Sequence, residues 1–377
     1  MSEQRSDRRG FLRSSLVTAG AVWAGSTARR VTAAPEPGGA PRLRFAAVGL
    51  NHGHIYSMCE AVVRGGGELV AYFAKEPDLA ADFGKRFPRA NLARSEKEIL
   101  DDPRIPLVAS AGIPDERAPL GIEVMRHGKD YMVDKPGMTT FEQLAEVKRV
   151  QAETRRIYSV DYSERFENRA TTKAAELVKA GAIGKVVQTI GLGPHRESPK
   201  TRPSWFYEKE RYGGILCDIG SHQFEQFLFF TGSTKAEIVA ARVANVSHPD
   251  RPGLEDFGDV MLQGDGGAGY IRVDWFTPDG LSTWGDGRLT VLGTDGFIEV
   301  RKNVDIAGRP GGSHLFLVDQ KSTRYVDSQD QDLPYGRLLV DDVLNRTETA
   351  MPQEHCFLAM DLALRAEKQA RPLRPMS

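Results

Sequence analysis

The fold is decided at residues 43–54, which read LRFAAVGLNHGH. The first six residues are mostly apolar, as in a buried strand, and Gly49 ends that run. Residues 55–63 then show the periodicity of an amphipathic helix. A glycine between a buried strand and a helix is typical of a turn that binds a phosphate group, because the free amides at the helix start can bind an anion.

This turn is a degenerate form of the GxGxxG motif. Gly49 holds the first glycine position, Asn51 the second and His54 the last. Asparagine tolerates left-handed backbone angles better than most residues, so the turn stays feasible. We predict that Gly49, Asn51 and His52 bind a dinucleotide, with an ordinary strand-to-helix turn as the alternative. His52 and His54 are two apart and would not share a helix face, so no metal site is predicted.

Strands and amphipathic helices alternate after this turn, which is typical of a parallel α/β sheet. The strand at 69–73 leads to a helix with Leu79, Phe83 and Phe87 on one face, and Gly128 follows a later helix as a C-cap. The pattern predicts a Rossmann domain over residues 42–160, with further strands at 69–73, 107–111, 131–133 and 158–160, and further helices at 116–127 and 141–154.

The second half of the chain, residues 161–377, has a different pattern. Glycine, proline and aspartate turns separate short β-rich runs, which predicts an α+β substrate domain with one large, mostly antiparallel sheet. The expected strands are 238–240, 258–262, 269–275, 288–292, 297–300 and 315–318, and the expected helices are 170–180, 221–230 and 354–369.

The N-terminus has the pattern of a twin-arginine export signal. Arg8 and Arg9 precede a short apolar run at residues 16–25, and Ala33 ends a small-x-Ala cleavage site. We predict that residues 1–34 are removed after export by the twin-arginine translocation machinery, which places the protein in the periplasm or another extracytoplasmic space. The apolar run is too short for a stable membrane span. The alternative is a basic amphipathic helix that stays with the protein.

Composition excludes several classes of protein. The 377 residues include 50 Lys+Arg and 51 Asp+Glu, for a formal net charge of -1, so the basic footprint of a nucleic-acid-binding protein is absent. Cys59, Cys217 and Cys356 are too far apart and too few for a disulfide framework or a structural zinc site. A small-molecule partner is expected.

The end of the second strand usually distinguishes NAD from NADP. Here Ala74 stands where an aspartate is usual, and Lys75 follows it. Lys75 could contact a 2′-phosphate, or it could be a solvated surface charge. The expected cofactor is therefore NAD or NADP, tightly bound.

Two further motifs carry polar groups suited to proton transfer. Asp134, Lys135 and Pro136 follow a strand at the edge where ligands of α/β sheets bind. In the second half, Asp218 and His222 lie four residues apart and can project to one side of a helix. A lysine, an aspartate and a histidine at one hydroxyl would form a proton-abstraction site. An imidazole at His222 is expected to titrate near neutrality.

These motifs resemble those of the Gfo/Idh/MocA oxidoreductases, whose Glu-Lys-Pro and GG…DxGxH elements match residues 134–136 and 213–222. The resemblance implies that Lys135 polarises the reacting oxygen and that Asp218 or His222 is the general acid/base. It also implies that Pro114, Asp115, Asp134 and Lys135 lie near the nicotinamide, and that the protein is a homo-oligomer built on the open sheet face. Asn51, Ala74 and Asp134 depart from the family pattern.

Hydride transfer between a sugar or polyol carbon and the nicotinamide is the expected reaction. Candidate pocket residues combine aromatic faces with hydrogen-bonding groups, as sugars require: Tyr162, Arg165, His195, Trp205, Tyr207 and His222. One alternative is a redox-neutral glycosidase or lyase that oxidises a sugar transiently, since no free nicotinamide pool is expected outside the cytoplasm. The alternative of another class is a non-catalytic carbohydrate-binding protein.

Overall fold

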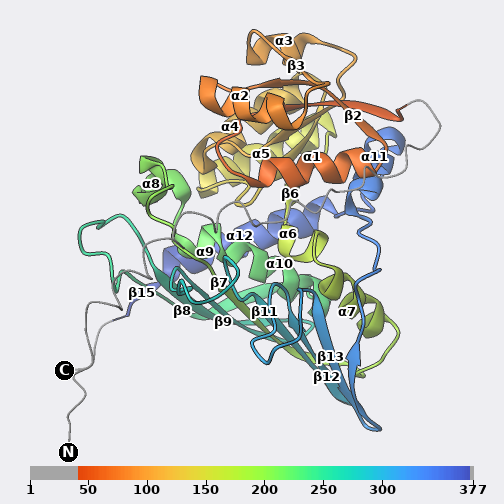
Figure 1. Ribbon diagram of the computed structural model, residues 1–377, viewed down its shortest axis with the longest axis vertical. Coiled ribbons are helices and arrows are strands. Elements are labelled where there is room, and N and C mark those ends of the chain that lie inside the picture. Colours follow the sequence, from red (N-terminus) through yellow and green to blue (C-terminus); the bar gives the residue numbers. More distant parts are fainter. Residues whose placement is uncertain (1–40, 374–377) are drawn as a thin grey trace, which may run out of the picture. The chain divides into compact units, whose positions relative to one another are not determined.

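The computed structural model describes residues 41–373, so the predicted export signal lies outside the described residues. The first part of the described chain forms a six-stranded parallel sheet in the order β3-β2-β1-β4-β5-β6 (Figure 1). Its elements are β1 (Leu43–Val48), α1 (His54–Arg64), β2 (Gly67–Phe73), α2 (Pro77–Arg86), β3 (Asn91–Leu92), α3 (Glu96–Asp101), β4 (Leu107–Ser110), α4 (Pro114–Arg126), β5 (Asp130–Asp134), α5 (Phe141–Thr154) and β6 (Tyr158–Asp161).

The central strands of this sheet are buried on both faces, which explains their continuous apolar runs. β4, β5 and β6 are buried at every position. The order of the strands reverses at β1, between β2 and β4, so the carboxyl ends of β1 and β4 border the crevice where open α/β sheets bind ligands. The predicted Rossmann fold is confirmed.

The second sheet has nine strands in the order β14-β13-β12-β11-β7-β10-β9-β8-β15. All of its pairings are antiparallel except β7 with β10 and β8 with β15, so the predicted mostly antiparallel sheet is confirmed. The strands are β7 (Val186–Pro194), β8 (Ala236–Ala244), β9 (Phe257–Gly264), β10 (Ala268–Asp274), β11 (Arg288–Gly293), β12 (Gly296–Arg301), β13 (His314–Asp319), β14 (Thr323–Val326) and β15 (Arg371–Pro372).

Helices cover one face of the second sheet. α10 packs directly on β7: a Cβ at Gly191 would lie 3.3 Å from Cβ and 2.4 Å from Oε1 of Gln223. The helices of this half are α6 (Ser163–Phe166), α7 (Arg169–Lys179), the 3-10 helix η1 (Ser204–Tyr207), α8 (Lys209–Tyr212), α9 (Ile215–Asp218), α10 (Gly220–Thr231), α11 (Tyr335–Asn345) and α12 (Gln353–Gln369).

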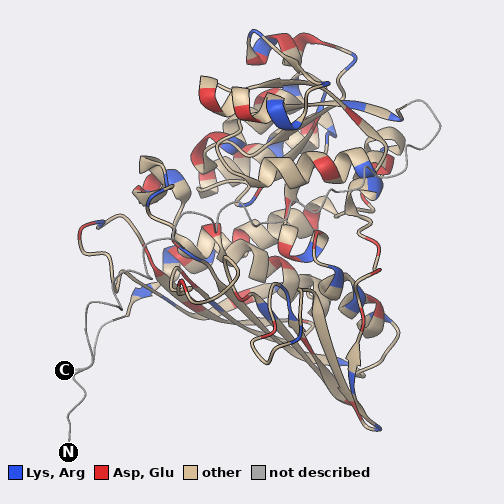
Figure 2. Ribbon diagram, in the orientation of Figure 1, with Lys and Arg blue, Asp and Glu red and all other residues tan. Residues whose placement is uncertain are grey.

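The last two helices return to the first sheet. α11 packs on α1 so closely that a Cβ at Gly336 would lie 1.9 Å from the carbonyl oxygen of Ala61. At the start of α12, Gln353 accepts a hydrogen bond from the amide of Tyr158 on β6 (2.8 Å). Both signs of charge are interspersed along the elements (Figure 2). Within residues 41–373, no helix has the length and apolar character required to cross a bilayer.

Candidate functional site

The turn after β1 allows a ligand to approach its backbone closely. Gly49 has a φ of +74°, and a Cβ there would lie 3.0 Å from the Cα of Gly112. The amide of Ala111 donates to the carbonyl of Gly49 (3.0 Å), which holds the turn against the end of β4. α1 begins at His54, and no side chain caps it at Gly53. A glycine turn followed by an uncapped helix start fits the pyrophosphate of a dinucleotide.

A carboxylate that the sequence did not predict lies beside this turn. Asn51 donates from Nδ2 to Oε1 of Glu76 (2.9 Å), and Glu76 follows β2 two residues beyond Ala74. Glu76 therefore supplies an acidic group near the position where a dinucleotide ribose binds. Lys75 is 70% exposed and pairs with Glu116 (3.1 Å), so its contact with a 2′-phosphate stays a prediction.

Asp134, at the end of β5, is completely buried among ionisable side chains. Its Oδ1 lies 2.8 Å from Nδ1 of His54, and its Oδ2 lies 2.9 Å from Nδ1 of His52 and 3.0 Å from Nη2 of Arg117. Burial alone would raise the pKa of Asp134, but His54, Arg117 and His52 hold it well below its usual range. Burial and the neighbouring His54 lower the pKa of His52 to about 4.

The two histidines come together, although the helix-face argument separates them. Their ring centroids are 4.3 Å apart, edge to face. Helix geometry does not separate the two rings, because His52 precedes α1 and only His54 belongs to the helix. A turn residue is free to point at the neighbour that helix geometry would separate from it.

Arg117 is a site residue that sequence reasoning missed. It is buried on α4 and donates to the carbonyl oxygens of Gly112 (2.7 Å) and Pro136 (3.2 Å) as well as to Asp134. A further hydrogen bond goes to the carbonyl of Lys135, which precedes Pro136 through a cis peptide bond. Arg117 thus fixes the strand end that carries the predicted catalytic lysine. Nothing in its spacing distinguishes it from a surface arginine.

Lys135 and Asp218 meet as the motifs predict. Nζ of Lys135 donates to Oδ1 of Asp218 at 2.8 Å, and the two side chains are 5% and 13% exposed. Burial opposes the charged form of Asp218, but the ammonium group lowers the pKa of this carboxyl. Asp218 ends α9, which begins after Gly213 and Gly214, both with a φ of +90°. The Gly-Gly element is therefore a backbone requirement of this ion pair.

His222 lies on the first turn of α10 and is almost fully buried. Its Nδ1 has no hydrogen-bond partner, and its ring centroid is 6.2 Å from that of Tyr162. Burial lowers the pKa of His222 to about 3, with Glu164 opposing and Lys135 reinforcing this change. The expected titration near neutrality is therefore wrong for this state, because a buried imidazole stays neutral. A neutral imidazole can accept a proton.

A buried polar network lies next to His222. Oε2 of Glu164 accepts from Nζ of Lys302 (2.5 Å) and from Nε2 of Gln223 (2.7 Å). Oε1 of Glu164 is buried without a hydrogen-bond partner. Glu164 and Lys302 are 138 residues apart in the sequence, so no local pattern could reveal this network.

His195 belongs to an aromatic cluster beside the ion pair. Its ring centroid is 4.5 Å from Trp284 and 5.5 Å from Trp275. Burial and the nearby charge of Lys135 lower the pKa of His195 to about 4. The cluster supplies the apolar faces and neutral donors that suit a sugar ring.

The other predicted pocket residues have defined partners. The hydroxyl of Tyr207 donates to Oε1 of Glu197 (3.0 Å), and Nε of Arg165 donates to Glu225 (2.6 Å). Trp205 is half-buried against the core, whereas Tyr162 is fully buried and its hydroxyl has no partner. Arg165 and Tyr207 are thus engaged by carboxylates, and Tyr162 keeps a free hydroxyl beside His222.

Pro114 and Asp115 open helix α4, as the resemblance places them beside the cofactor cleft. Asp115 pairs with Nη1 of Arg211 at 3.4 Å, and burial raises the pKa of Asp115. Arg211 lies on α8, so this ion pair joins α4 to the second half of the chain.

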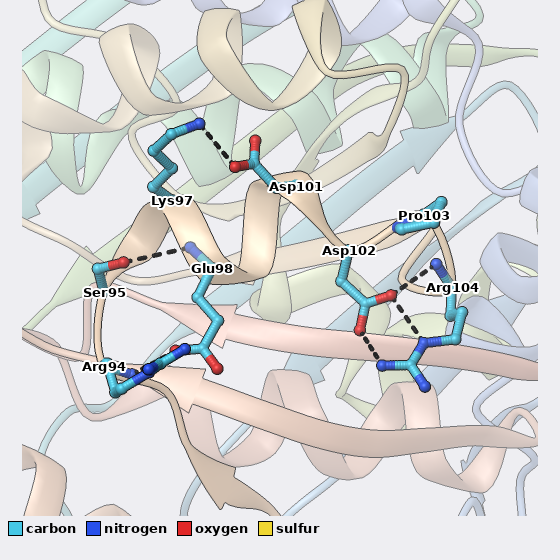
Figure 3. A pocket seen from close by; sticks show the side chains of 8 residues that line it. All are labelled: Arg94, Ser95, Lys97, Glu98, Asp101, Asp102, Pro103 and Arg104. Atoms are coloured by element: carbon cyan, nitrogen blue, oxygen red, sulfur yellow. Dashed lines mark hydrogen bonds and ion pairs between the residues drawn. The ribbon is translucent and has the colours of Figure 1, made fainter.

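A separate hollow lies at α3 (Figure 3). Its charged side chains pair with one another, as in Lys97 with Asp101 (2.6 Å) and Arg104 with Asp102 (2.8 Å). None of the predicted site residues lines it. We do not assign the active site there, because its charges are already balanced and exposed.

Two family models match the chain. The model described as "Oxidoreductase family, NAD-binding Rossmann fold" matches residues 43–162, and the "GFO/IDH/MocA C-terminal domain" matches residues 171–299. The first match contains the Gly49 turn and Lys135, and the second contains Asp218 and His222. The NAD-binding model agrees with the fit of the β1–α1 turn to a pyrophosphate.

Curated relatives include dehydrogenases. Levoglucosan dehydrogenase of Pseudarthrobacter phenanthrenivorans is 27% identical over 52% of this chain, and scyllo-inositol 2-dehydrogenase (NAD(+)) of Bacillus subtilis is 26% identical over 59%. The matched stretches span 51% and 64% of the lengths of these relatives.

Solved structures share the whole fold. A provisionally named oxidoreductase of Erwinia carotovora atroseptica is 47% identical, with a TM-score of 0.86 over 88% of this chain and 100% of that one. Levoglucosan dehydrogenase in complex with NADH has a TM-score of 0.70 over 87% of this chain and 98% of that one, at 18% identity. Both halves of the sequence therefore match one family, and the chain belongs to the Gfo/Idh/MocA oxidoreductases.

Proposed function

We propose that the protein is an NAD(P)-dependent dehydrogenase that acts on a secondary alcohol of a sugar or polyol. The observation that carries this proposal is the 2.8 Å ion pair between Lys135 and Asp218, which joins the strand end of the Rossmann domain to α9. A neutral, buried His222 lies close enough to Lys135 for that charge to shift its pKa.

The chain's own residues would perform the proton transfer. The dinucleotide supplies the hydride acceptor when bound. Lys135 would orient the substrate oxygen and stabilise its developing negative charge. The hydroxyl proton would pass to the imidazole of His222 or to the carboxylate of Asp218, both of which are unprotonated at neutral pH. The choice between these two bases stays open.

Support for a carbohydrate substrate comes from the aromatic cluster of His195, Trp275 and Trp284. Aromatic faces pack on the C–H groups of sugar rings, and neutral donors bind their hydroxyls. The names of the curated relatives, levoglucosan dehydrogenase and scyllo-inositol 2-dehydrogenase, also favour this substrate class.

A redox-neutral variant of this chemistry is favoured by the twin-arginine pattern at residues 8–33. We propose that the protein is exported by this route with its cofactor bound. Regeneration of the cofactor in place would then come from a second sugar, or from re-reduction of the first after elimination and hydration. Either scheme uses the same Lys135 and the same base.

A homo-oligomer is proposed on the open face of the second sheet. Met261, Leu292 and Phe297 are exposed there, and the strand register places Leu292 directly opposite Phe297. Neighbouring apolar side chains that are exposed in one chain are typical of a surface that a second chain covers. Light scattering after size exclusion should give a mass above that of one chain, and charged substitutions at Met261 and Leu292 should reduce it.

The decisive experiment is to denature the purified protein and identify any nucleotide released. Near-stoichiometric NAD or NADP supports the proposal. Candidate sugars are then mixed with the loaded protein, and reduction of the nicotinamide is followed by absorbance in a single turnover. A protein that carries no nucleotide and binds neither NAD nor NADP would instead be a non-catalytic carbohydrate-binding protein.

A further inference from the structure

Three metal-ligating side chains converge beside the β1–α1 turn. Nδ1 of His52, Nδ1 of His54 and a carboxylate oxygen of Asp134 all lie within 4.8 Å of one another. The two imidazoles come from a turn and a helix start, and the carboxylate comes from the end of β5. Three protein ligands with a further position left open are usual for catalytic zinc sites.

The geometry at His52 is compatible with a shared metal ion. Its Nδ1 is buried from solvent and has no hydrogen-bond partner, yet it lies 2.9 Å from Oδ2 of Asp134. The two atoms are close enough to bind one ion together with Nδ1 of His54. In a tetrahedral site, ligand atoms bound about 2.1 Å from the ion are about 3.4 Å apart, so the two atoms would separate slightly when an ion binds.

A buried carboxyl group and a guanidinium flank the three side chains. Asp161 on β6 lies beside Asp134 in the strand register, is completely buried, and has no hydrogen-bond partner at either carboxylate oxygen. Arg117 also lies here, and its guanidinium pairs with Oδ2 of Asp134 at 3.0 Å. Burial and the neighbouring Glu167 raise the pKa of Asp161 well above its usual range, so Asp161 adds no fixed negative charge to this cluster.

We propose that His52, His54 and Asp134 bind one divalent transition-metal ion of the zinc type. Two imidazole nitrogens and one carboxylate oxygen select zinc, cobalt or iron over magnesium and calcium, which prefer all-oxygen sites. The side chains of His52 and His54 are 26% and 29% exposed, so water or a ligand can reach the remaining coordination position.

A consequence for the cofactor rests on the proposed function. Asn51 and His52 are consecutive on the turn that fits the pyrophosphate. A divalent ion on His52 would fix this turn and attract the anionic phosphates, so metal and dinucleotide should each strengthen the binding of the other.

The test uses the full chain with a tag that contains no histidine, after dialysis against a chelator. Co²⁺ is titrated and followed by its visible absorption, and Zn²⁺ is then added as a competitor. We expect one Co²⁺ per chain, displaced by one Zn²⁺. His52→Gln and His54→Gln should each weaken binding by more than about 100-fold, since even partners of metal ligands contribute about 10–100-fold. Thermal melts of the metal-free variants check that both fold.

The matched control is His127→Gln. His127 lies in the same domain with a similarly exposed side chain (32%), but its neighbour is the exposed Asp101 at 3.7 Å. Unchanged Co²⁺ affinity in the control supports the site. Equal affinity in His54→Gln and the unmodified protein, or no binding of one ion per chain, would overturn it. Released nucleotide is measured separately, so a protein that binds metal but no dinucleotide would contradict only the proposed function.

Discussion

Asp134 and Lys135 are consecutive residues with opposite surroundings. The carboxylate of Asp134 stays inside the Rossmann domain, where Arg117 and two histidines contact it. The ammonium of Lys135 reaches into the second half of the chain and pairs with Asp218 alone. Side chains at the end of a strand alternate in direction, so adjacent residues serve different sites.

Asp134 holds the end of β5 in place, whereas the pair of Lys135 with Asp218 is suited to take part in the reaction. Asp134 is completely buried with several partners, whereas Asp218 keeps 13% of its side chain exposed and has one. A carboxylate with several fixed partners stabilises a strand end, because breaking one contact leaves the others. A pair with a single contact and an open side can exchange that contact for a substrate oxygen. The predictions below test this division.

The largest effect is expected from Lys135→Met. Loss of the ammonium should lower the rate of single-turnover nicotinamide reduction by about 10²–10⁴-fold. Charge stabilisation or acid–base catalysis by one residue typically contributes a rate factor of this size. The matched control is Lys129→Met, since Lys129 is also buried but donates only to the carbonyls of Asp102 and Ile105. The control should lose about 1–3 kcal/mol of stability with little change in rate. Equal rates in Lys135→Met and the unmodified enzyme would refute the mechanism.

Arg117→Met tests the anchoring role of Asp134. Removing the guanidinium leaves buried Asp134 with only its two histidine contacts, and the carbonyls of Lys135 and Pro136 lose their side-chain donor, so the free energy of unfolding should fall by about 3–5 kcal/mol. Urea denaturation measures this. Arg126→Met on the same helix should cost less than about 1 kcal/mol, because its pairs with Glu123 and Glu146 are exposed. Similar losses in the two variants would argue against an anchor at Arg117.

Gly49→Ala tests the cofactor position. A side chain at a φ of +74° costs about 1–2 kcal/mol, and its Cβ would also crowd Gly112 where the pyrophosphate is expected. Dinucleotide affinity should fall at least about tenfold, as read by nucleotide content and titration. Gly181→Ala is the control, because its φ is +78° and no atom lies within 4 Å of its Cβ. Its stability should fall without loss of affinity, whereas full loading of Gly49→Ala would place the cofactor elsewhere.

Most of the fold follows from sequence periodicity, and the exceptions have physical reasons. β7 was not predicted because Gly191, Gly193 and Pro194 interrupt its pattern. Gly191 leaves room for Gln223 on α10, and this tertiary contact cannot be seen in a local stretch of sequence. α11 was also not predicted. It packs on α1.

The site was predicted where short motifs carry the geometry. Lys135 follows the end of β5 next to Pro136, whose φ is fixed, and Asp218 ends α9, which starts after two glycines with a φ of +90°. Arg117 and Glu164 were missed because their partners lie far away in sequence. The pairing of His52 with His54 was missed because one of them lies before the helix.

The smallest effect concerns pH and compares His222 with His248. His222 has its pKa lowered to about 3, so the unfolded chain binds more protons between that value and 6.5. Stability should therefore fall as pH drops through this window, and His222→Gln should remove up to about 1.4 kcal/mol per pH unit of that slope. His52 and His195 contribute the same sign and leave a residual slope.

His248 should behave in the opposite way. Burial lowers its pKa, but Asp256 (2.9 Å) and Glu197 (2.7 Å) overcome this and raise the pKa above 6.5. Its contribution is complete below the unfolded pKa and is lost as pH rises through the folded one. The deficit of His248→Gln should thus be largest in acid and shrink toward alkaline pH, by about 1 kcal/mol or less because the pair is partly exposed. Urea denaturation from about pH 5 to 9 measures both variants. Parallel pH curves for the two would show that the buried imidazole is not held neutral, and His222 would lose its case as the base.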